Sequence, residues 1–180
     1  MSTSLDPRAI RSQTMLKNAL LQLLLEGKQL HQLSVQKVTT HAGLNRTTFY
    51  LHYHDLEHLK EQMTQEVLTQ LTLKITVLMK ESSPNRQEQV VDMLTYLYEQ
   101  RTLLTVLNQF DAVEKHLFAL FKELINTRRK QPVKPKRTHY IDSDIKTASI
   151  VGVILWWLKN EQSLPALHVA EQIELMNQQP

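Results

Sequence analysis

Glycine is scarce in this sequence. The 180 residues contain three, Gly27, Gly43 and Gly152, whereas a chain of this length at average usage holds about a dozen. β-Rich folds need glycine in tight turns, and phosphate-binding loops need it where the backbone approaches the ligand. Because the three glycines lie far apart, neither a GxGxxG loop nor a P-loop is present, which excludes dinucleotide and Walker-type nucleotide sites. The composition predicts an all-α fold.

Cysteine is absent, which excludes disulfides, cysteine-ligated zinc and thiol nucleophiles and fits a reducing compartment. The first residues are polar and lack the apolar core of a signal peptide. The longest apolar run, Ile150 to Leu158, has nine residues, against about 20 needed to span a bilayer. We therefore expect a cytoplasmic protein that makes no membrane contact.

The small excess of positive charge is concentrated near the N-terminus. Residues 1–60 carry the whole formal charge of +3, and five of the eight histidines lie there as well. A basic, histidine-rich segment on an otherwise neutral chain favours contact with a polyanion, since lysine and arginine release counterions from phosphates. A random distribution of charged residues along the chain explains the same numbers, so charge alone does not decide whether this segment binds a polyanion.

Helical periodicity runs through most of the chain. The first helix is predicted to begin at Asp6-Pro7, an N-cap acid followed by proline, and to end at Gly27. Another, from Asp55 to about Lys80, carries an apolar stripe at 3.6-residue spacing. A domain boundary near residue 60 separates a 1–60 head from a 61–180 body. Further helices are expected at about 87–100, 101–109, 111–129, 142–160 and 165–178, which makes about nine in all.

The segment from Ser34 to Tyr50 has the pattern of a helix-turn-helix. Ser34 is placed to cap a short helix, and Gly43 permits the left-handed turn that lets two short helices cross closely. Asn45 then caps a third helix, predicted to run from Arg46 to about Tyr53. The inward side is formed by Val38, Ala42, Leu44 and Phe49. The outward side is formed by Arg46, Thr47, Thr48, Tyr50 and His52, a set suited to base edges and phosphates in a DNA major groove.

These residues resemble the DNA-binding head of the TetR family of bacterial regulators. The run from Ala42 to Tyr53, AGLNRTTFYLHY, contains the Ala-Gly-hydrophobic turn, the short recognition helix, the tyrosine, and then the histidine and aromatic residue. Trp157-Leu158-Lys159-Asn160 and the final helix are similar to a small-subunit subgroup from Gram-positive bacteria. Two positions depart from the family pattern: Leu56 stands where a phosphate-binding lysine is common, and Thr39 where alanine is common.

The resemblance implies roles for single residues of the head. Arg46, Thr47 and Thr48 are expected to read bases, and Tyr50 and His52 to contact phosphates. Phe49 and Tyr53 are interpreted as core. The predicted DNA-binding set is Ser34, Lys37, Asn45, Arg46, Thr47, Thr48, Tyr50, His52 and Lys60.

For the body, the resemblance implies a homodimer whose last two helices pair with their copies, and an effector cavity between helices. The two heads of such a dimer would bind a palindromic operator on double-stranded DNA, with a small-molecule effector releasing it. The predicted interface residues are Ile150, Ile154, Trp157, Val169 and Ile173. The predicted cavity residues are Tyr96, Phe110, Phe118, Phe121 and Trp156. Aromatic residues at helical spacing also pack ordinary cores, so that alternative stays open for the second set.

Other functions find less support. His54 and His58 share a helical face, but no carboxylate completes a metal-binding set, and no metal or cofactor is expected. The remaining histidines are scattered without a nucleophile, so no enzyme is expected. The alternative from another class is a helical protein-interaction regulator of the same fold that has lost operator binding, which Leu56 favours.

Overall fold

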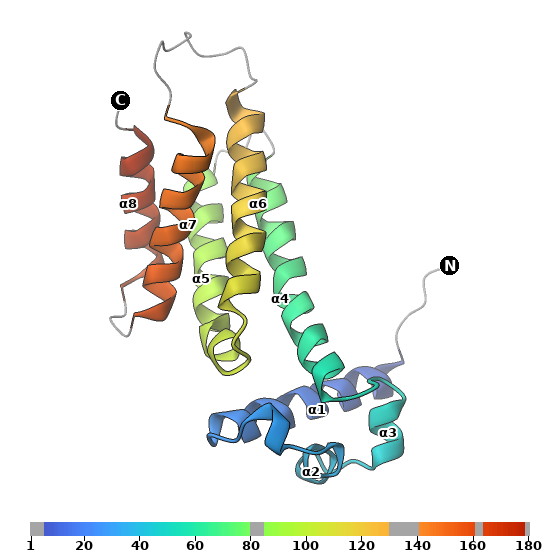
Figure 1. Ribbon diagram of the computed structural model, residues 1–180. Coiled ribbons are helices and arrows are strands. Elements are labelled where there is room, and N and C mark those ends of the chain that lie inside the picture. The colour runs from blue at the N-terminus through green and yellow to red at the C-terminus, as the bar shows by residue number, and fades with distance from the viewer. Residues whose placement is uncertain (1–5, 80–84, 130–140, 161–163, 179–180) are drawn as a thin grey trace. The chain divides into compact units, whose positions relative to one another are not determined.

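The computed structural model describes residues 6–79, 85–129, 141–160 and 164–178. All regular elements within these ranges are helical, which confirms the predicted all-α fold (Figure 1). The elements are α1 (Pro7–Leu25), the 3₁₀ turn η1 (Leu30–Gln32), α2 (Val35–His41), α3 (Arg46–Tyr50), α4 (Leu56–Met79), α5 (Arg86–Val106), α6 (Phe110–Arg129), α7 (Ser143–Lys159) and α8 (Ala166–Gln178).

The chain divides into two compact units, Met1–Glu66 and Val67–Pro180, so the division falls inside α4. We call them the first unit and the second unit. The apolar stripe predicted for α4 is buried along the whole helix, from Leu56 to Leu78. Lys80, where the sequence placed the end of this helix, lies outside the described residues.

Local capping determines where the first helices begin and end. The Asp6 carboxylate accepts a hydrogen bond from the Arg8 amide at 3.0 Å, and Pro7 occupies the first turn of α1. The helix ends at Gly27, whose φ of 82° is the left-handed conformation that glycine adopts without strain. The start and the end of α1 therefore agree with the predictions from Asp6-Pro7 and Gly27.

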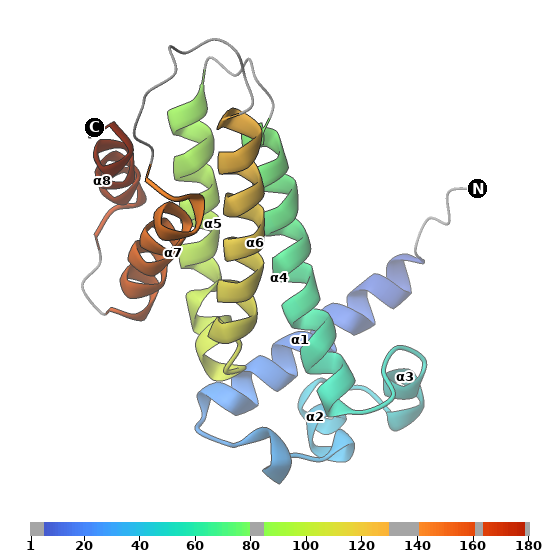
Figure 2. The same cartoon turned by 45° about the horizontal axis from the view of Figure 1, so that its top comes forward.

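The turn between α2 and α3 is closed by a second left-handed glycine. Gly43 has a φ of 66°, and the Leu44 amide donates back to the Thr39 carbonyl at 2.9 Å. This 6→1 bond is the C-terminal motif that a left-handed residue permits. Figure 2 shows α2 and α3 joined by this short turn. Ser34 and Asn45 cap the two helices as predicted, but α3 ends at Tyr50 rather than at Tyr53.

In the second unit, α5 to α8 and the last part of α4 run alongside one another (Figure 1). Their inward faces form one apolar core, in which α6 packs on α7 and α5 on α8. In both views α7 and α8 lie on the side away from α4. The largest fully buried side chains of this unit are Trp157, Leu71, Ile75, Met93, Leu94, Leu97, Leu104 and Leu117.

One predicted helix break does not exist. The sequence pattern suggested separate helices at 87–100 and 101–109, but α5 is continuous through Arg101 to Val106. The break lies at Asn108, which has a φ of 54° and follows the helix cap at Leu107. Asparagine tolerates this left-handed conformation better than most residues. Eight α-helices and one 3₁₀ turn thus occupy the described ranges, close to the nine expected.

Among the described helices, none combines the length and the apolar character that a membrane span requires.

Candidate nucleic-acid interface

The N-terminal end of α3 is held by the side chain that precedes it. The Asn45 Oδ1 accepts from the Thr48 amide at 2.7 Å and from the Thr48 hydroxyl at 2.9 Å. The first bond satisfies the Thr48 amide, which has no partner within the helix. The second bond uses the only hydroxyl hydrogen of Thr48, whose oxygen is left to accept. The cap therefore fixes α3 and sets the chemistry that Thr48 can offer to a base.

Three of the predicted base- and phosphate-contacting residues are exposed on α3. Arg46, Thr47 and Tyr50 all point to solvent, and the Tyr50 side chain is 51% exposed. The Arg46 guanidinium lies 5.9 Å from the centre of the Tyr50 ring and donates to its hydroxyl at 3.4 Å. Phe49 is fully buried on the opposite side of the helix, as predicted. The helix thus presents a cation, a hydroxyl and a phenol on one outer face.

The other predicted contacts lie on neighbouring elements. Ser34 caps α2 by accepting from the Lys37 amide at 3.2 Å, and both side chains are exposed at the start of that helix. Lys60 lies one turn into α4, where its ammonium group pairs with the Glu57 carboxylate at 3.3 Å. Leu56 is buried, so the position where the family has a lysine belongs to the core of the first unit.

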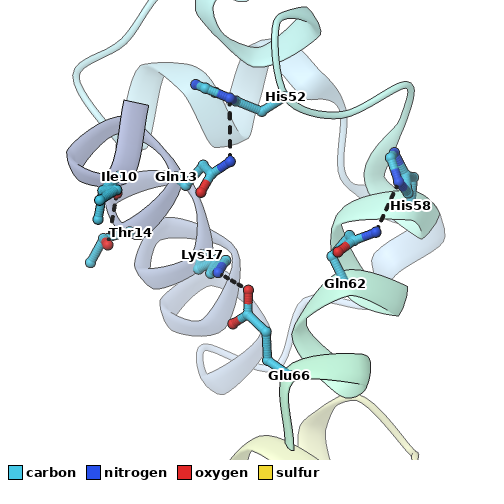
Figure 3. A network of polar contacts seen from close by, with 8 residues as sticks. All are labelled: Ile10, Gln13, Thr14, Lys17, His52, His58, Gln62 and Glu66. Carbon is cyan, nitrogen blue, oxygen red and sulfur yellow. Dashed lines mark hydrogen bonds and ion pairs between the residues drawn. The ribbon is translucent and has the colours of Figure 1, made fainter. Parts of the chain in front are cut away.

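His52 lies differently from the prediction. Its ring is directed toward α1, with Nε2 at 2.8 Å from the Ser12 hydroxyl. Nδ1 lies 3.4 Å from the Gln13 side-chain amide (Figure 3). Both ring nitrogens therefore have partners within the first unit. This geometry does not support the phosphate contact that the sequence suggested for His52.

A contact between α1 and α4 lies near Tyr53. The Lys17 ammonium group forms an ion pair with the Glu66 carboxylate (Figure 3). Tyr53 is 4% exposed and packs on Phe49 with ring centres 5.6 Å apart. Burial, together with the negative charge of Glu66, raises the pKa of Tyr53 to about 12. Tyr53 is thus a core residue, as predicted.

The raised pKa of Tyr53 predicts a loss of stability at high pH. An unfolded tyrosine has a pKa of about 10, so the folded state holds the phenol proton more tightly. The resulting stabilisation is complete below pH 10 and is lost as the pH rises from about 10 through 12, by about 3 kcal/mol in all. We expect urea unfolding between pH 8 and 11.5 to show this decline, and Tyr53→Phe to remove it. An equal decline in the variant would contradict the assignment.

His54 and His58 form a stacked pair at the start of α4. Their ring centres lie 4.8 Å apart, and the His58 Nδ1 accepts from the His54 amide at 3.2 Å. The Asp55 carboxylate accepts from the His58 amide at 2.8 Å as the cap of α4. In the part of the chain that the structure describes, no cluster of three or more histidine, aspartate or glutamate residues is arranged to hold a metal ion.

The second unit identifies the family. Residues 84–179, more than half of the chain, match the family model TetR_C_8, described as a transcriptional regulator C-terminal region. The chain belongs to the TetR family. This TetR-family chain combines that C-terminal region with a first unit in which α2, the Gly43 turn and α3 form a helix-turn-helix.

The chain is also similar to individual proteins, at low sequence identity. The uncharacterized HTH-type transcriptional regulator YxbF of Bacillus subtilis (strain 168) is 25% identical over 171 residues, which cover 89% of this chain and 43% of that protein. The chain thus spans less than half the length of that curated relative.

NalD, the secondary repressor of the MexAB-OprM multidrug efflux pump in Pseudomonas aeruginosa, has a TM-score of 0.63 at 20% identity over 96% of both chains. A transcriptional regulator from Aquifex aeolicus VF5 has a TM-score of 0.68 at 17% identity over 92% of this chain and 99% of that one. Both likenesses show the same fold.

The side chains predicted to line an effector cavity have different surroundings in this TetR-family protein. Phe121 is buried in the core, whereas Tyr96 lies under the Lys74 ammonium group and Phe110 under that of Lys159. Phe118 borders a shallow hollow of about 390 Å³ with Asp111, Glu114 and Lys115, all of them on α6. A hollow lined by one helix is a surface feature and not an enclosed cavity.

The two adjacent tryptophans lie differently from the predictions. Trp157 is 1% exposed, stacks on Tyr98 at 5.0 Å and donates to the Leu164 carbonyl at 3.0 Å, whereas Trp156 is 54% exposed. Trp156 is therefore not part of a cavity lining. The prediction that Trp157 faces a partner subunit is wrong, because its ring is enclosed by its own chain. The other predicted interface side chains are buried in the same core: Ile150, Ile154, Val169 and Ile173.

Proposed function

We propose that this TetR-family protein is a dimeric, sequence-specific DNA-binding regulator that inserts α3 into the major groove. The observation that carries the proposal is the outer face of α3, where Arg46, Thr47 and Tyr50 are exposed together on a helix held by Asn45 and Phe49. A short, rigid helix with a cation and hydroxyls on one side fits a groove that displays base donors and acceptors.

Each side chain suits a different contact. Arg46 can leave the Tyr50 ring and donate two hydrogen bonds to a guanine, the commonest specific contact of arginine. Thr48, whose hydroxyl hydrogen is bound to Asn45, can accept from the amino group of adenine or cytosine. Tyr50 and Lys37 are exposed and can donate to phosphates, which positions the helix without reading sequence.

The subunit interface is proposed to lie on the exposed faces of α7 and α8. Trp156 is the largest side chain there, and aromatic anchors of this kind dominate interface energies. Gly152 lies one turn before it, and a methyl group added there would meet no atom within 4 Å apart from its chain neighbours and the nearby backbone of α7. A partner helix can approach closely at such a position. The other large apolar side chains exposed on the described parts of these two helices are Ile145, Leu167, Leu175 and Met176.

A dimer built this way would place its two heads on a palindromic operator, with half-sites one helical turn, about 34–36 Å, apart. We further propose repression that is released by a small-molecule effector. The similarity in fold to NalD, which is named a repressor, supports this direction of regulation. An effector can release DNA only if it binds one spacing of the heads more tightly than the other.

The DNA-binding proposal predicts a large effect at Arg46. We expect the protein to enrich one sequence from a library of random duplexes, and Arg46→Ala to weaken binding of that selected duplex about tenfold to hundredfold. Lys115→Ala is the matched control, because it removes one exposed positive charge from the second unit. Anisotropy titrations at several salt concentrations measure both variants. Equal losses in the two, or enrichment of no sequence, would contradict sequence reading by α3.

The second candidate is a regulator of the same fold that acts through protein contacts. It is favoured by Leu56, which is buried where the family has a phosphate-binding lysine, and by the pairing of Lys60 with Glu57. The same titrations decide between the two, because DNA binding through phosphates must weaken steeply as salt rises. Binding that is absent, or independent of salt, on every duplex would favour the protein-contact function.

A further inference from the structure

The ring of His52 connects the end of the helix-turn-helix to α1. Ser12, on α1, is 9% exposed, and its oxygen lies 2.8 Å from His52 Nε2 although the two residues are 40 positions apart. The next residue, Gln13, places its side-chain nitrogen 3.4 Å from His52 Nδ1. Figure 3 shows the His52 ring directed at Gln13. One imidazole thus has partners on both of its nitrogens from a single helix.

The hydrogen bonds around the ring are consistent with one tautomer. The Ser12 hydroxyl donates to the Ala9 carbonyl at 3.0 Å. Since a hydroxyl has one hydrogen, its oxygen must accept from His52, which places a proton on Nε2. In a neutral ring Nδ1 is then an acceptor, which matches the side-chain N–H of Gln13 facing it. The proton positions are inferred from this network, and every donor in it has an acceptor.

The ring lies directly after α3. The backbone amides of His52 and Tyr53 both donate to the Phe49 carbonyl, at 3.0 and 2.9 Å. The last turn of the recognition helix is therefore continuous with the residue that binds α1. Phe49 holds this turn through the apolar core, and His52 holds it through directional bonds, which restrict its rotation in a way that packing alone does not.

We infer that His52, with Ser12 and Gln13, is a positioning residue for sequence reading: it sets the orientation of α3 and does not itself contact DNA. The inference rests on the proposed DNA-binding function. Base recognition requires the contacting groups to be held within about 0.5 Å of the productive geometry, whereas attraction to phosphates tolerates looser placement. Loss of the His52 bonds should therefore reduce discrimination between sequences and leave general affinity for DNA intact.

The test uses the full chain and two duplexes: one recovered by the wild-type protein from a random library, and a shuffled duplex of the same composition. Ser12→Ala removes the partner of Nε2 from inside the first unit, with a residue that favours helix. His52→Phe keeps an aromatic ring without nitrogens, and His52→Gln keeps one amide donor in place of Nε2–H. His41→Gln is the matched control, because His41 also binds α1, through Gln22 at 2.8 Å, but at an exposed site on α2.

We expect Ser12→Ala and His52→Phe each to weaken the selected duplex about fivefold to tenfold, the loss of about one hydrogen bond. The double variant should lose little more than His52→Phe alone, because the bond that Ser12→Ala removes is one of the two that His52→Phe already removes. Affinity for the shuffled duplex and the slope of log Kd against log salt should stay unchanged. His52→Gln should recover part of the loss, and only while Ser12 is present. His41→Gln should match the wild type on both duplexes.

Three results would overturn the inference. A salt slope reduced by about one in His52→Phe, on both duplexes and without any effect of Ser12→Ala, would make His52 a phosphate contact. Losses that are equal on both duplexes and follow a lowered unfolding midpoint would show a structural role only. Full binding by Ser12→Ala would show that the bond has no consequence. If the wild type enriches no sequence, it is the DNA-binding proposal that fails, and this result is distinct from the other three.

Discussion

Trp157→Ala is expected to lower the free energy of unfolding of the second unit by about 3–5 kcal/mol, the usual cost of removing a large buried ring. The ring is enclosed by its own chain, stacks on Tyr98 and donates to the Leu164 carbonyl. Its loss opens a cavity between α5 and α7 and removes the hydrogen bond that holds the segment before α8. Urea unfolding followed by circular dichroism at one protein concentration measures the change.

Trp156→Ala is the matched control, since it removes the same side chain one position earlier. Because Trp156 is half exposed, we expect less than about 0.5 kcal/mol change in the stability of the isolated chain. In the proposed dimer Trp156 is an interface anchor, so its loss should weaken the dimer roughly 30-fold. Sedimentation velocity should therefore show the variant dissociating into monomers at a roughly 30-fold higher protein concentration than the wild type. Equal unfolding costs in the two variants would contradict the burial of Trp157 and the exposure of Trp156. An unchanged dimer in Trp156→Ala would contradict the proposed interface.

Phe49→Ala is expected to destabilise the first unit by about 3–5 kcal/mol. Phe49 is fully buried on the inner side of α3. Its ring centre lies 5.5 Å from that of Tyr50 and 5.6 Å from that of Tyr53. Without this ring the recognition helix has no apolar anchor, and a segment of about 60 residues has little stability to spare. DNA binding should therefore be lost together with the folded first unit.

Hydrogen exchange on the full chain tests this locally. Peptides from α1 to α3 should lose protection in Phe49→Ala, whereas peptides from α7 should keep it, because the two units have separate cores. Phe49→Leu is the control, since it keeps most of the apolar volume and should cost less than about 1.5 kcal/mol. Protection retained in α1 to α3, or lost to the same extent in α7, would contradict a local role for Phe49.

Features that depend on neighbouring residues were predictable from sequence. Asp6-Pro7, Ser34, Asn45 and Gly43 begin or end helices as predicted, because a cap or a left-handed turn involves residues within one helical turn. The apolar stripe of α4 and the core position of Phe49 were predictable for a related reason, since periodicity tells which side of an amphipathic helix is buried. Asn108 is a local signal as well, although the predicted break lay between residues 100 and 101.

Contacts between distant residues were decided by the tertiary structure. The sequence predicts different surroundings for the two rings, an effector cavity for Trp156 and a partner subunit for Trp157, because side chains about 100° apart on a helix have different neighbours. Only the packing of α5 against α7 shows that Trp157 is the inner one, next to Tyr98. The partner of His52 was decided in the same way. Its imidazole can bind a phosphate or a hydroxyl, and the hydroxyl that it contacts belongs to Ser12, which lies 40 residues away in the sequence. Local interactions thus determine the helices and the turn at Gly43, whereas long-range packing decides which side chains remain exposed.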